Sequence, residues 1–386
     1  MSEKKLLKAR DLKVRFYTDE GQINAVENVD LDLYENDVLG IVGESGSGKS
    51  VTGLCIMGLI DSPGRVDGGS IWYRNPSLLD EYGADPAVET DGPFIDVLTL
   101  PDEVRRSLRA RSFSMVFQDP MESFDPSYTV GEQIAEAVEV QRRIDADTDT
   151  TNEYGLRDLL LSTVSDSHRY VSDRSRERAV ELLEMVGLSD PDQRADEYPH
   201  QYSGGMLQRA ILAQALAADP DVLIADEPTS ALDVTIQAQI LELLADIQDE
   251  TGMSIILITH NLGVVARACE HVSVMYAGEV VEYAHIEQIL DTPAHPYTRG
   301  LIRSVPEISI HDQVLDPISG NVPNLFDEEM GDECYFADRC PEALDECFSA
   351  NPDDVDIAPD HTAKCVLVDS EERTDHESLS IEAEDD

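Results

Sequence analysis

The eight residues GESGSGKS, Gly43–Ser50, have the composition and spacing of a loop that binds the phosphates of a nucleotide. Glycines let backbone N–H groups wrap an anion, and a helical pattern begins directly afterwards. Lys49 can neutralise phosphate oxygens, and the Ser50 hydroxyl can bind Mg²⁺. The candidate nucleotide-binding residues of this segment are Gly43, Ser45, Gly46, Ser47, Gly48, Lys49, Ser50 and Val51.

Two adjacent carboxylates, Asp226 and Glu227, end the apolar pattern DVLIAD. Open α/β sheets bind ligands at the carboxyl ends of their strands. There Asp226 could hold Mg²⁺, and Glu227 could accept a proton from an attacking water. Paired acids alone are weak support in so acidic a chain. Their place after an apolar strand and downstream of a phosphate loop predicts a catalytic site.

Two further polar residues also follow predicted strands. Gln118 comes after FSMVF, and its amide could bind Mg²⁺ and sense the γ-phosphate. His260 ends SIILIT, and a neutral imidazole there could hydrogen-bond the γ-phosphate and the attacking water. Either residue alone would be interpreted as structural. Their shared position at strand ends beside the predicted nucleotide site favours catalytic roles.

A second candidate anion site opens the stretch YSGGMLQR. Ser203, Gly204 and Gly205 come directly before an Ala- and Leu-rich helical pattern. Backbone N–H groups at the start of a helix, left uncovered by two glycines, attract a phosphate group. The residues alone do not say whose phosphate this second site binds.

The elements that must position these residues alternate along the chain. Strand patterns at 8–17 and 23–33 precede the buried strand pattern at 38–43, and a helix is expected from about Gly48 to Ile60. Helix and strand patterns then alternate, at 203–218 (helix), 221–226 (strand), 233–250 (helix), 254–260 (strand) and 262–268 (helix). This alternation predicts an α/β fold with a parallel sheet wrapped by helices.

Composition limits the functional class. The chain has 386 residues, 41% of them apolar, which suffices for one large domain with an appendage or for two domains. Its net charge of −51, from 28 basic and 79 acidic residues, disfavours binding to nucleic acid. The acidic residues spread along the whole chain, which predicts a carboxylate coat suited to the high-salt cytoplasm of a halophile. No signal-peptide or membrane-spanning pattern is visible, so we expect a cytoplasmic protein.

Taken in order, these motifs resemble the ABC-type ATPases. The resemblance rests on the phosphate loop, Gln118, the SGG stretch, Asp226–Glu227, SALD at Ser230–Asp233, and His260. It implies that two subunits pair head to tail, so that Ser203–Gly205 of one binds the γ-phosphate held by Lys49 of the other. It also implies that Asp233 communicates between the two composite sites.

The resemblance also suggests an adenine-binding residue. Phe16 stands where family members carry an aromatic that stacks on adenine, with Tyr17 as the neighbouring candidate. A core-facing aromatic of a strand is the alternative interpretation. Three positions depart from the family pattern, namely Tyr202, Met206 and Asn261; the last could alter the orientation of His260.

Longer phrases are similar to the ATPase subunits of oligopeptide and dipeptide importers, including nickel-peptide relatives. They are QDPMESFDPSYTVGEQI at 118–134, YSGGMLQR, and HPYTRGLIRSVP at 295–306. The resemblance implies an ABC ATPase domain at 1–290, with a RecA-like core, an antiparallel β subdomain and a helical subdomain at about 119–205. A small cysteine-rich C-terminal domain at 291–368 and a disordered acidic tail at 369–386 are expected to follow.

The implied function is ATP hydrolysis with Mg²⁺ that powers peptide uptake from the cytoplasmic face of the membrane. The implied partners are two membrane permeases, a second, non-identical ATPase subunit and an extracytoplasmic solute-binding protein, with no nucleic acid. An importer ATPase for another solute, such as a nickel chelate or an oligosaccharide, is one alternative. A soluble ABC ATPase that acts on nucleic acid or ribosomes is another.

Four cysteines cluster near the C-terminus, with the spacing C-x5-C-x6-C-x17-C: Cys334, Cys340, Cys347 and Cys365. In a cytoplasmic protein, four such thiols favour a metal site over disulfides. A tetrahedral sulfur site suits zinc or an iron–sulfur cluster, although the C-x2-C pairs of zinc ribbons are missing. Resemblance to the C-terminal extension of peptide-importer ATPases implies a [4Fe-4S] cluster. Zinc, and free or buried thiols, remain alternatives.

Overall fold

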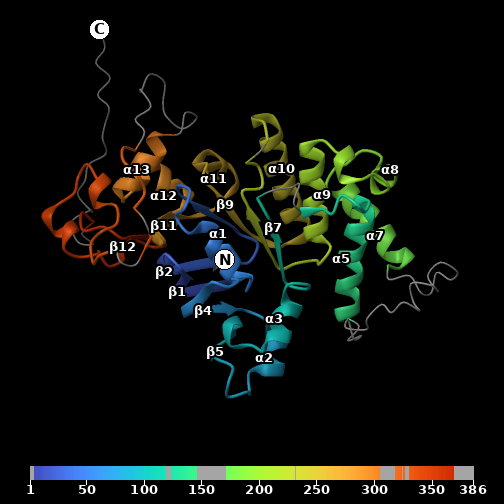
Figure 1. The fold of residues 1–386 in the computed structure, drawn as a ribbon, viewed down its shortest axis with the longest axis horizontal. Helices are drawn as coiled ribbons and strands as arrows, with labels where there is room; N and C mark the ends of the chain where they lie inside the picture. The colour runs from blue at the N-terminus through green and yellow to red at the C-terminus, as the bar shows by residue number, and fades with distance from the viewer. Residues whose placement is uncertain are drawn as a thin grey trace, which may run out of the picture.

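The computed structural model in Figure 1 describes residues 4–118, 123–145, 171–230, 232–304, 318–323, 325–326 and 330–368. Most of a polar stretch at 145–155, which we interpret from the sequence as an inserted loop, lies outside these residues. The predicted acidic tail at 369–386 also lies outside them.

An eight-stranded sheet forms the centre of the fold, in the order β12-β13-β11-β10-β3-β9-β8-β7. Neighbours from β10 to β7 pair in parallel. These strands are β3 (Val38–Val42), β7 (Phe113–Val116), β8 (Val222–Asp226), β9 (Ser254–Thr259) and β10 (His271–Tyr276). Every residue of β3, β8, β9 and β10 is buried, as expected for a parallel sheet that is covered on both faces. The predicted parallel α/β core is confirmed.

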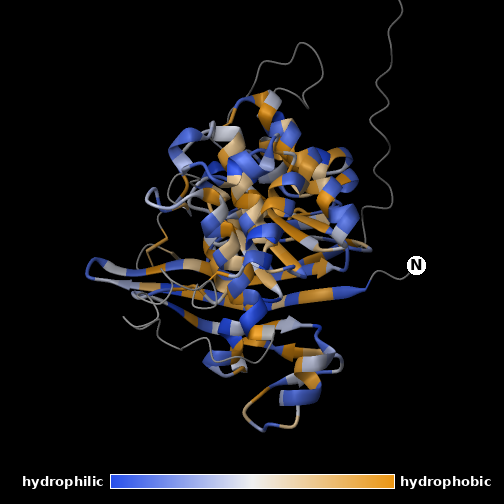
Figure 2. Ribbon diagram, turned by 90° about the vertical axis from the view of Figure 1, so that its right-hand side faces the viewer, coloured by the Kyte–Doolittle hydropathy of each residue, from blue (hydrophilic) through white to orange (hydrophobic). Residues whose placement is uncertain are grey.

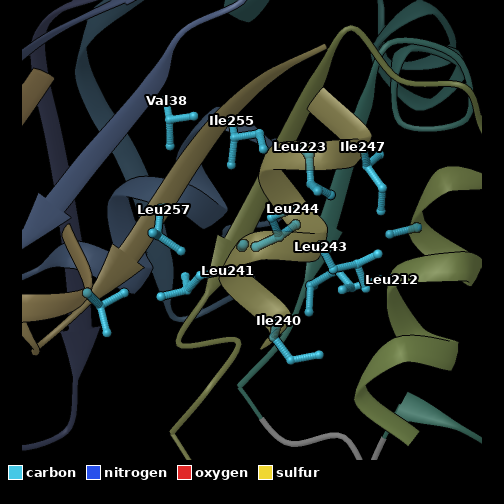
Figure 3. Packing of buried hydrophobic residues seen from close by; sticks show 14 of the residues in the cluster. Val38, Leu212, Leu223, Ile240, Leu241, Leu243, Leu244, Ile247, Ile255 and Leu257 are labelled. Carbon is cyan, nitrogen blue, oxygen red and sulfur yellow. The ribbon is translucent and has the colours of Figure 1, made fainter. Parts of the chain in front are cut away.

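Helices cover this sheet as the alternation predicted. They are α1 (Lys49–Ile56), α9 (Gly204–Leu216), α10 (Val234–Thr251) and α11 (Leu262–Ala268). Figure 3 shows apolar side chains of α10 facing those of the sheet, among them Leu244, Leu223 and Leu257. The helix expected to run to Ile60 ends at Ile56, because Gly58 takes a left-handed φ of 63° that interrupts the helical backbone.

A second, antiparallel sheet has the order β2-β1-β4-β6-β5. Its strands are β1 (Lys5–Thr18), β2 (Gly21–Tyr34), β4 (Gly64–Tyr73), β5 (Thr90–Asp91) and β6 (Phe94–Asp96). The helices beside it are α2 (Pro76–Tyr82), η1 (Val97–Thr99) and α3 (Asp102–Leu108). Its inner face shares one hydrophobic cluster with α1 and the central sheet. Figure 2 shows apolar residues concentrated where strands and helices pack together.

A group of helices packs against α9, at the end of the molecule away from β12 in Figure 1. It comprises α5 (Val130–Asp145), α7 (Asp173–Met185), α8 (Pro191–Ala195) and η3 (Pro199–Gln201). Ile134, Leu182 and Leu207 lie in their shared core. These helices lie within residues 119–205, where the resemblance implies a helical subdomain.

The cysteine-bearing extension continues the central sheet. A hairpin between β10 and β11 (Glu279–His285) turns at Ala277 and Gly278, whose φ angles of 49° and 86° suit such a tight turn. Strand β13 then pairs with β11, and β12 pairs with β13. The other elements are α12 (Ile286–Asp291), α13 (Pro296–Arg303), η4 (Ala337–Arg339), η5 (Asp345–Phe348), β12 (Val355–Ala358) and β13 (His361–Ala363). The extension is therefore joined to the cassette through backbone pairing.

Within the described part of the chain, no helix has the length and apolar character needed to cross a membrane.

Candidate functional site

The candidate phosphate loop, Gly43–Ser50, joins β3 to α1 and requires glycine at two places. A Cβ on Gly43 would come within 2.1 Å of the Met275 carbonyl oxygen. A Cβ on Gly48, whose φ is 96°, would come within 2.5 Å of the Ala25 carbonyl oxygen. The Gly278 amide donates to the Ser47 carbonyl oxygen at 3.1 Å, so the turn between β10 and β11 is hydrogen-bonded to the loop.

Lys49, the first residue of α1, is buried and folded onto its own loop. Its Nζ donates to the Gly43 carbonyl oxygen at 2.9 Å and to the Glu44 carbonyl oxygen at 2.7 Å. Burial lowers the pKa of Lys49, while the charges of Glu227, Asp226 and Glu44 oppose that shift. An ammonium group at this place can exchange carbonyl oxygens for the oxygens of a phosphate.

Ser50 and Asp226 meet at the carboxyl end of β8. The Ser50 Oγ donates to Asp226 Oδ1 at 3.1 Å. The pKa of Asp226 is raised by burial and by the neighbouring Glu227 carboxylate, whereas the Ser50 hydrogen bond and Lys49 lower it. A hydroxyl and a carboxylate in contact supply two of the oxygen ligands that Mg²⁺ prefers.

Glu227 lies between Gln118 and His260. Gln118 Nε2 donates to Glu227 Oε2 at 3.2 Å, and His260 Nδ1 lies 3.0 Å from Oε1. The Glu227 backbone has a left-handed φ of 46°, and its amide donates to the Ile258 carbonyl oxygen at 2.8 Å. This left-handed conformation is uncommon in a residue other than glycine. The carboxylate is therefore oriented from three neighbouring strands.

The structure places the second candidate anion site on the surface. Ser203 caps α9 by accepting from the Met206 amide at 3.4 Å, and both Ser203 and Gly204 are exposed. Gly205 is half-buried. Asp233 caps α10, where its carboxylate accepts from the Thr235 and Ile236 amides at 3.1 Å and 3.0 Å. An exposed helix start of this kind can bind a phosphate from outside this chain's own loop.

Other predicted nucleotide-binding residues differ in exposure. Phe16 is half-buried against the cluster of the antiparallel sheet, whereas Tyr17 is 44% exposed and donates its hydroxyl to Asp67. Ser45 and Gly46 are exposed, and Val51 is half-buried. Phe16 thus packs in part as the core alternative predicted.

Of the four cysteines of the extension, Cys347 and Cys365 are buried, and Cys334 and Cys340 are half-buried. Burial and the thiols of Cys334, Cys340 and Cys347 raise the pKa of Cys365 to about 11. The Cys334 amide donates to the Cys347 carbonyl oxygen at 2.8 Å. Among the described residues, however, no group of three or more histidine, cysteine or acidic side chains is arranged to hold a metal ion. The thiols are the right ligands for a soft metal, but they are not placed in coordinating geometry.

Three residues at the phosphate loop were missed by the sequence analysis. The Glu44 carboxylate pairs with Arg339, and the Glu44 amide donates to the Tyr297 hydroxyl at 2.9 Å. Tyr297 and Arg339 both lie in the extension, far from the loop in sequence. The loop pattern leaves the identity of its second residue open, so it gave no signal of these contacts.

Family comparison covers both parts of the chain. Residues 26–230 match the ABC transporter family. Residues 281–347 match the family described as the C-terminal region of oligopeptide/dipeptide transporters.

Curated relatives match over nearly their whole length. The chain is 41% identical over 383 residues to the dipeptide transport ATP-binding protein DppD of Bacillus subtilis (strain 168), which covers 99% of each chain. It is 42% identical over 347 residues to the protein of the same name from Haemophilus influenzae, which covers 90% of this chain and 91% of that one.

Solved structures share the fold. The dimeric structure of MJ0796, a bacterial ABC transporter cassette, has a TM-score of 0.54 and 27% identity, over 73% of this chain and 99% of that one. The structure of cbiO1 from Clostridium perfringens has a TM-score of 0.53 and 24% identity, over 75% and 92% of the two chains. The chain belongs to the ABC transporter family, as an ATP-hydrolysing subunit of its oligopeptide/dipeptide importer group.

Proposed function

We propose that this chain hydrolyses ATP to drive the uptake of dipeptides and oligopeptides across the cytoplasmic membrane. The observation that carries the proposal is the likeness to dipeptide transport ATP-binding proteins, which spans both the cassette and the extension. The site at the end of β8 supports the hydrolytic chemistry, because it gathers a lysine, an acid pair and a histidine beside a phosphate loop.

The residues divide the chemistry among them. Lys49 and the amide groups of the loop bind the β- and γ-phosphates, and Phe16 stacks on adenine. Ser50, Asp226 and Gln118 would hold Mg²⁺, which would neutralise charge on the phosphate oxygens. Glu227 accepts a proton from the attacking water.

His260 fixes the orientation of this base. A carboxylate can only accept, so in a neutral imidazole the hydrogen bond assigns the proton to Nδ1 of His260 and leaves Nε2 as an acceptor. Gln118 holds the other carboxylate oxygen, so loss of either partner would free Glu227 to rotate. In the intact transporter, Gln118 reports the nucleotide state through the adjoining helices to the permeases.

A second subunit completes each ATP site in this proposal. Exposure of Ser203 and Gly204 supports it, since their amides are accessible to a nucleotide held by another chain. Asp233, whose carboxylate caps α10, then lies in the path between the two sites. We propose a non-identical ATPase as the partner, together with two permeases and an extracytoplasmic solute-binding protein, with this chain peripheral to the cytoplasmic face of the membrane and no nucleic acid involved.

The four cysteines would hold a [4Fe-4S] cluster, with zinc as the alternative metal. The bound metal would stabilise the extension. The presence of four thiols in one extension, with a backbone hydrogen bond between Cys334 and Cys347, supports the proposal, although bringing the thiols into coordinating geometry would require them to move. Anaerobic purification followed by iron, sulfide and zinc analysis tests it. Four irons with four sulfides per chain support the cluster, about one zinc supports the alternative, and neither metal contradicts both.

The net charge of −51 supports adaptation to high salt, and therefore a halophilic source. Unscreened carboxylates repel one another, so the folded state should lose stability as salt is removed. Urea unfolding at about 0.1 M and about 3 M KCl measures the difference. Equal unfolding free energies at the two concentrations would contradict this inference.

The transport proposal is tested by affinity purification of the tagged chain from detergent-solubilised membranes of its source cells at high salt. We expect mass spectrometry to find two multi-span permeases and a second ATPase. The untagged strain controls for background. Uptake of labelled dipeptide should be lost when the gene is deleted, whereas unchanged uptake, or recovery of ribosomal proteins without membrane partners, would contradict the proposal. A deletion that abolished nickel-chelate or oligosaccharide uptake instead would assign another solute.

A further inference from the structure

Arg339 connects the C-terminal extension to the phosphate loop. Its Nη1 donates to Glu44 Oε2 at 2.6 Å, and its Nη2 donates to Glu44 Oε1 at 2.9 Å. This two-bonded pairing is the strongest geometry between a guanidinium and a carboxylate. The Arg339 side chain is only 5% exposed and that of Glu44 is 29% exposed, so water screens the pair poorly.

The guanidinium is itself held in place. Arg339 Nε donates to the Ser319 carbonyl oxygen at 3.0 Å, and Nη1 also donates to the Tyr276 hydroxyl at 3.2 Å. Tyr276, Tyr297 and Phe336 are almost fully buried, with ring centroids 4.7 to 5.4 Å apart. These rings join β10 and the extension beneath the pair, so Arg339 approaches Glu44 from a rigid base.

The Glu44 backbone is fixed as well. Its amide donates to the Tyr297 hydroxyl at 2.9 Å, and its carbonyl oxygen accepts from Lys49 Nζ at 2.7 Å. Two of these restraints, from Tyr297 and Arg339, come from the extension. The extension therefore sets the conformation of the residue directly after Gly43, where the loop turns toward its ligand.

We propose that Arg339 is a positioning residue for ATP binding, which acts through Glu44. It pairs with and neutralises a carboxylate that would otherwise face the negative charge of the nucleotide. This inference rests on the proposed function of Gly43–Ser50 and adds a role for the extension at that site. The extension thereby completes the ATP site of its own chain.

The charges predict how variants should behave. Arg339→Gln leaves the Glu44 carboxylate half-buried, unpaired and close to the phosphates, so nucleotide affinity should fall. Glu44→Gln removes that charge, so adding it to Arg339→Gln should restore affinity in the double variant. Arg339→Lys keeps the charge without the two-bonded fork, and its effect should be intermediate.

The test measures the Kd for the non-hydrolysable analogue Mg-AMP-PNP, and the KM and kcat for MgATP, at constant ionic strength. We expect Arg339→Gln to raise both Kd and KM about tenfold, with kcat at saturating ATP within about twofold of the parent. Arg339→Gln/Glu44→Gln should return to within about threefold of the parent Kd. Arg299→Gln is the matched control, because Arg299 pairs with Glu342 on the surface of the same extension and should leave Kd unchanged.

Two results would overturn the inference. One is parental nucleotide affinity in Arg339→Gln. The other is a double variant as weak as Arg339→Gln, which would mean that a loosened extension, and not the uncovered charge, causes the loss. If Arg339→Gln does not fold, Arg339→Lys and Arg339→Lys/Glu44→Gln make the same comparison.

Lys49→Ala separates this inference from the proposed function. If Lys49→Ala loses binding while Arg339→Gln keeps it, the phosphate loop assignment stands and only the role of Arg339 fails. If Lys49→Ala binds like the parent, the loop is not the nucleotide site, and both fail.

Discussion

The Nδ1 atom of His260 lies 3.0 Å from Oε1 of Glu227, so two strand ends bring a histidine onto a carboxylate. His260 is 59% exposed, whereas Glu227 is 16% exposed. In the proposed mechanism the less exposed Glu227 is the base and His260 supports it. An asparagine follows His260, and its side chain caps α11 by accepting from the Gly263 amide at 2.9 Å. That substitution does not remove the histidine from Glu227.

Replacing His260 with alanine should reduce kcat for ATP by about a hundredfold, because the base loses one of its two side-chain partners. Nucleotide affinity should stay within about threefold of the parent, since Lys49 and the loop are untouched. Steady-state ATPase assays and analogue binding measure the two quantities. His200→Ala, which removes an exposed histidine of η3, is the control. A kcat near the parent value would show that His260 does not orient the base.

Alanine in place of Gly43 should destabilise the fold by about 3 kcal/mol, since the added Cβ meets a backbone carbonyl that cannot turn aside. The nearest atom is the Met275 carbonyl oxygen, at 2.1 Å from the added carbon. Gly46→Ala is the comparison, because a Cβ there meets nothing within 4 Å and only the φ of 81° is unfavourable, at about 1 kcal/mol. Urea unfolding without nucleotide should separate the two variants; equal losses would show that steric contact at Gly43 is not decisive.

His295 should make stability depend on pH. It is fully buried, and burial lowers its pKa to about 4, against about 6.5 in an unfolded chain. Between these values the unfolded state binds one more proton than the folded state, so the free energy of unfolding falls as pH decreases. The contribution of His295 to the free energy of unfolding is fully present above pH 6.5, where it amounts to about 3 kcal/mol relative to low pH.

Comparison with His295→Asn separates the titration of His295 from that of the many carboxylates. His295 caps α13 by accepting from the Tyr297 amide at 3.0 Å, and asparagine can still form such a cap. The difference in unfolding free energy between parent and variant should shrink from pH 7 to pH 4. A constant difference would mean that His295 titrates normally in the folded protein.

Local patterns predicted the parts of the fold that depend on neighbours in sequence. The continuous apolar runs ending at Asp226 and Thr259 became buried parallel strands. Since the carboxyl ends of parallel strands lie at one edge of the sheet, Glu227 and His260 could be predicted to meet.

Contacts between distant segments could not be predicted in this way. β13, which pairs with β11, has only the three residues His361–Ala363. Three residues are too few to show the alternation of apolar and polar side chains that indicates a strand. Arg339 is one cation in a chain with 79 acidic residues, and no pattern distinguishes Glu44 as its partner. The strand pattern at 8–17 predicted that Phe16 lies on a strand, but it could not predict how deeply the ring is buried.

The most direct test of the catalytic site is the turnover of Glu227→Gln compared with that of the parent protein. The amide keeps the shape of the side chain but cannot accept a proton, so we predict that kcat falls at least about a hundredfold while MgATP binding is retained. Glu250→Gln, which changes an exposed acid at the end of α10, should hydrolyse ATP at the parent rate. Turnover of Glu227→Gln near the parent rate would contradict the assignment of the base and the mechanism built on it.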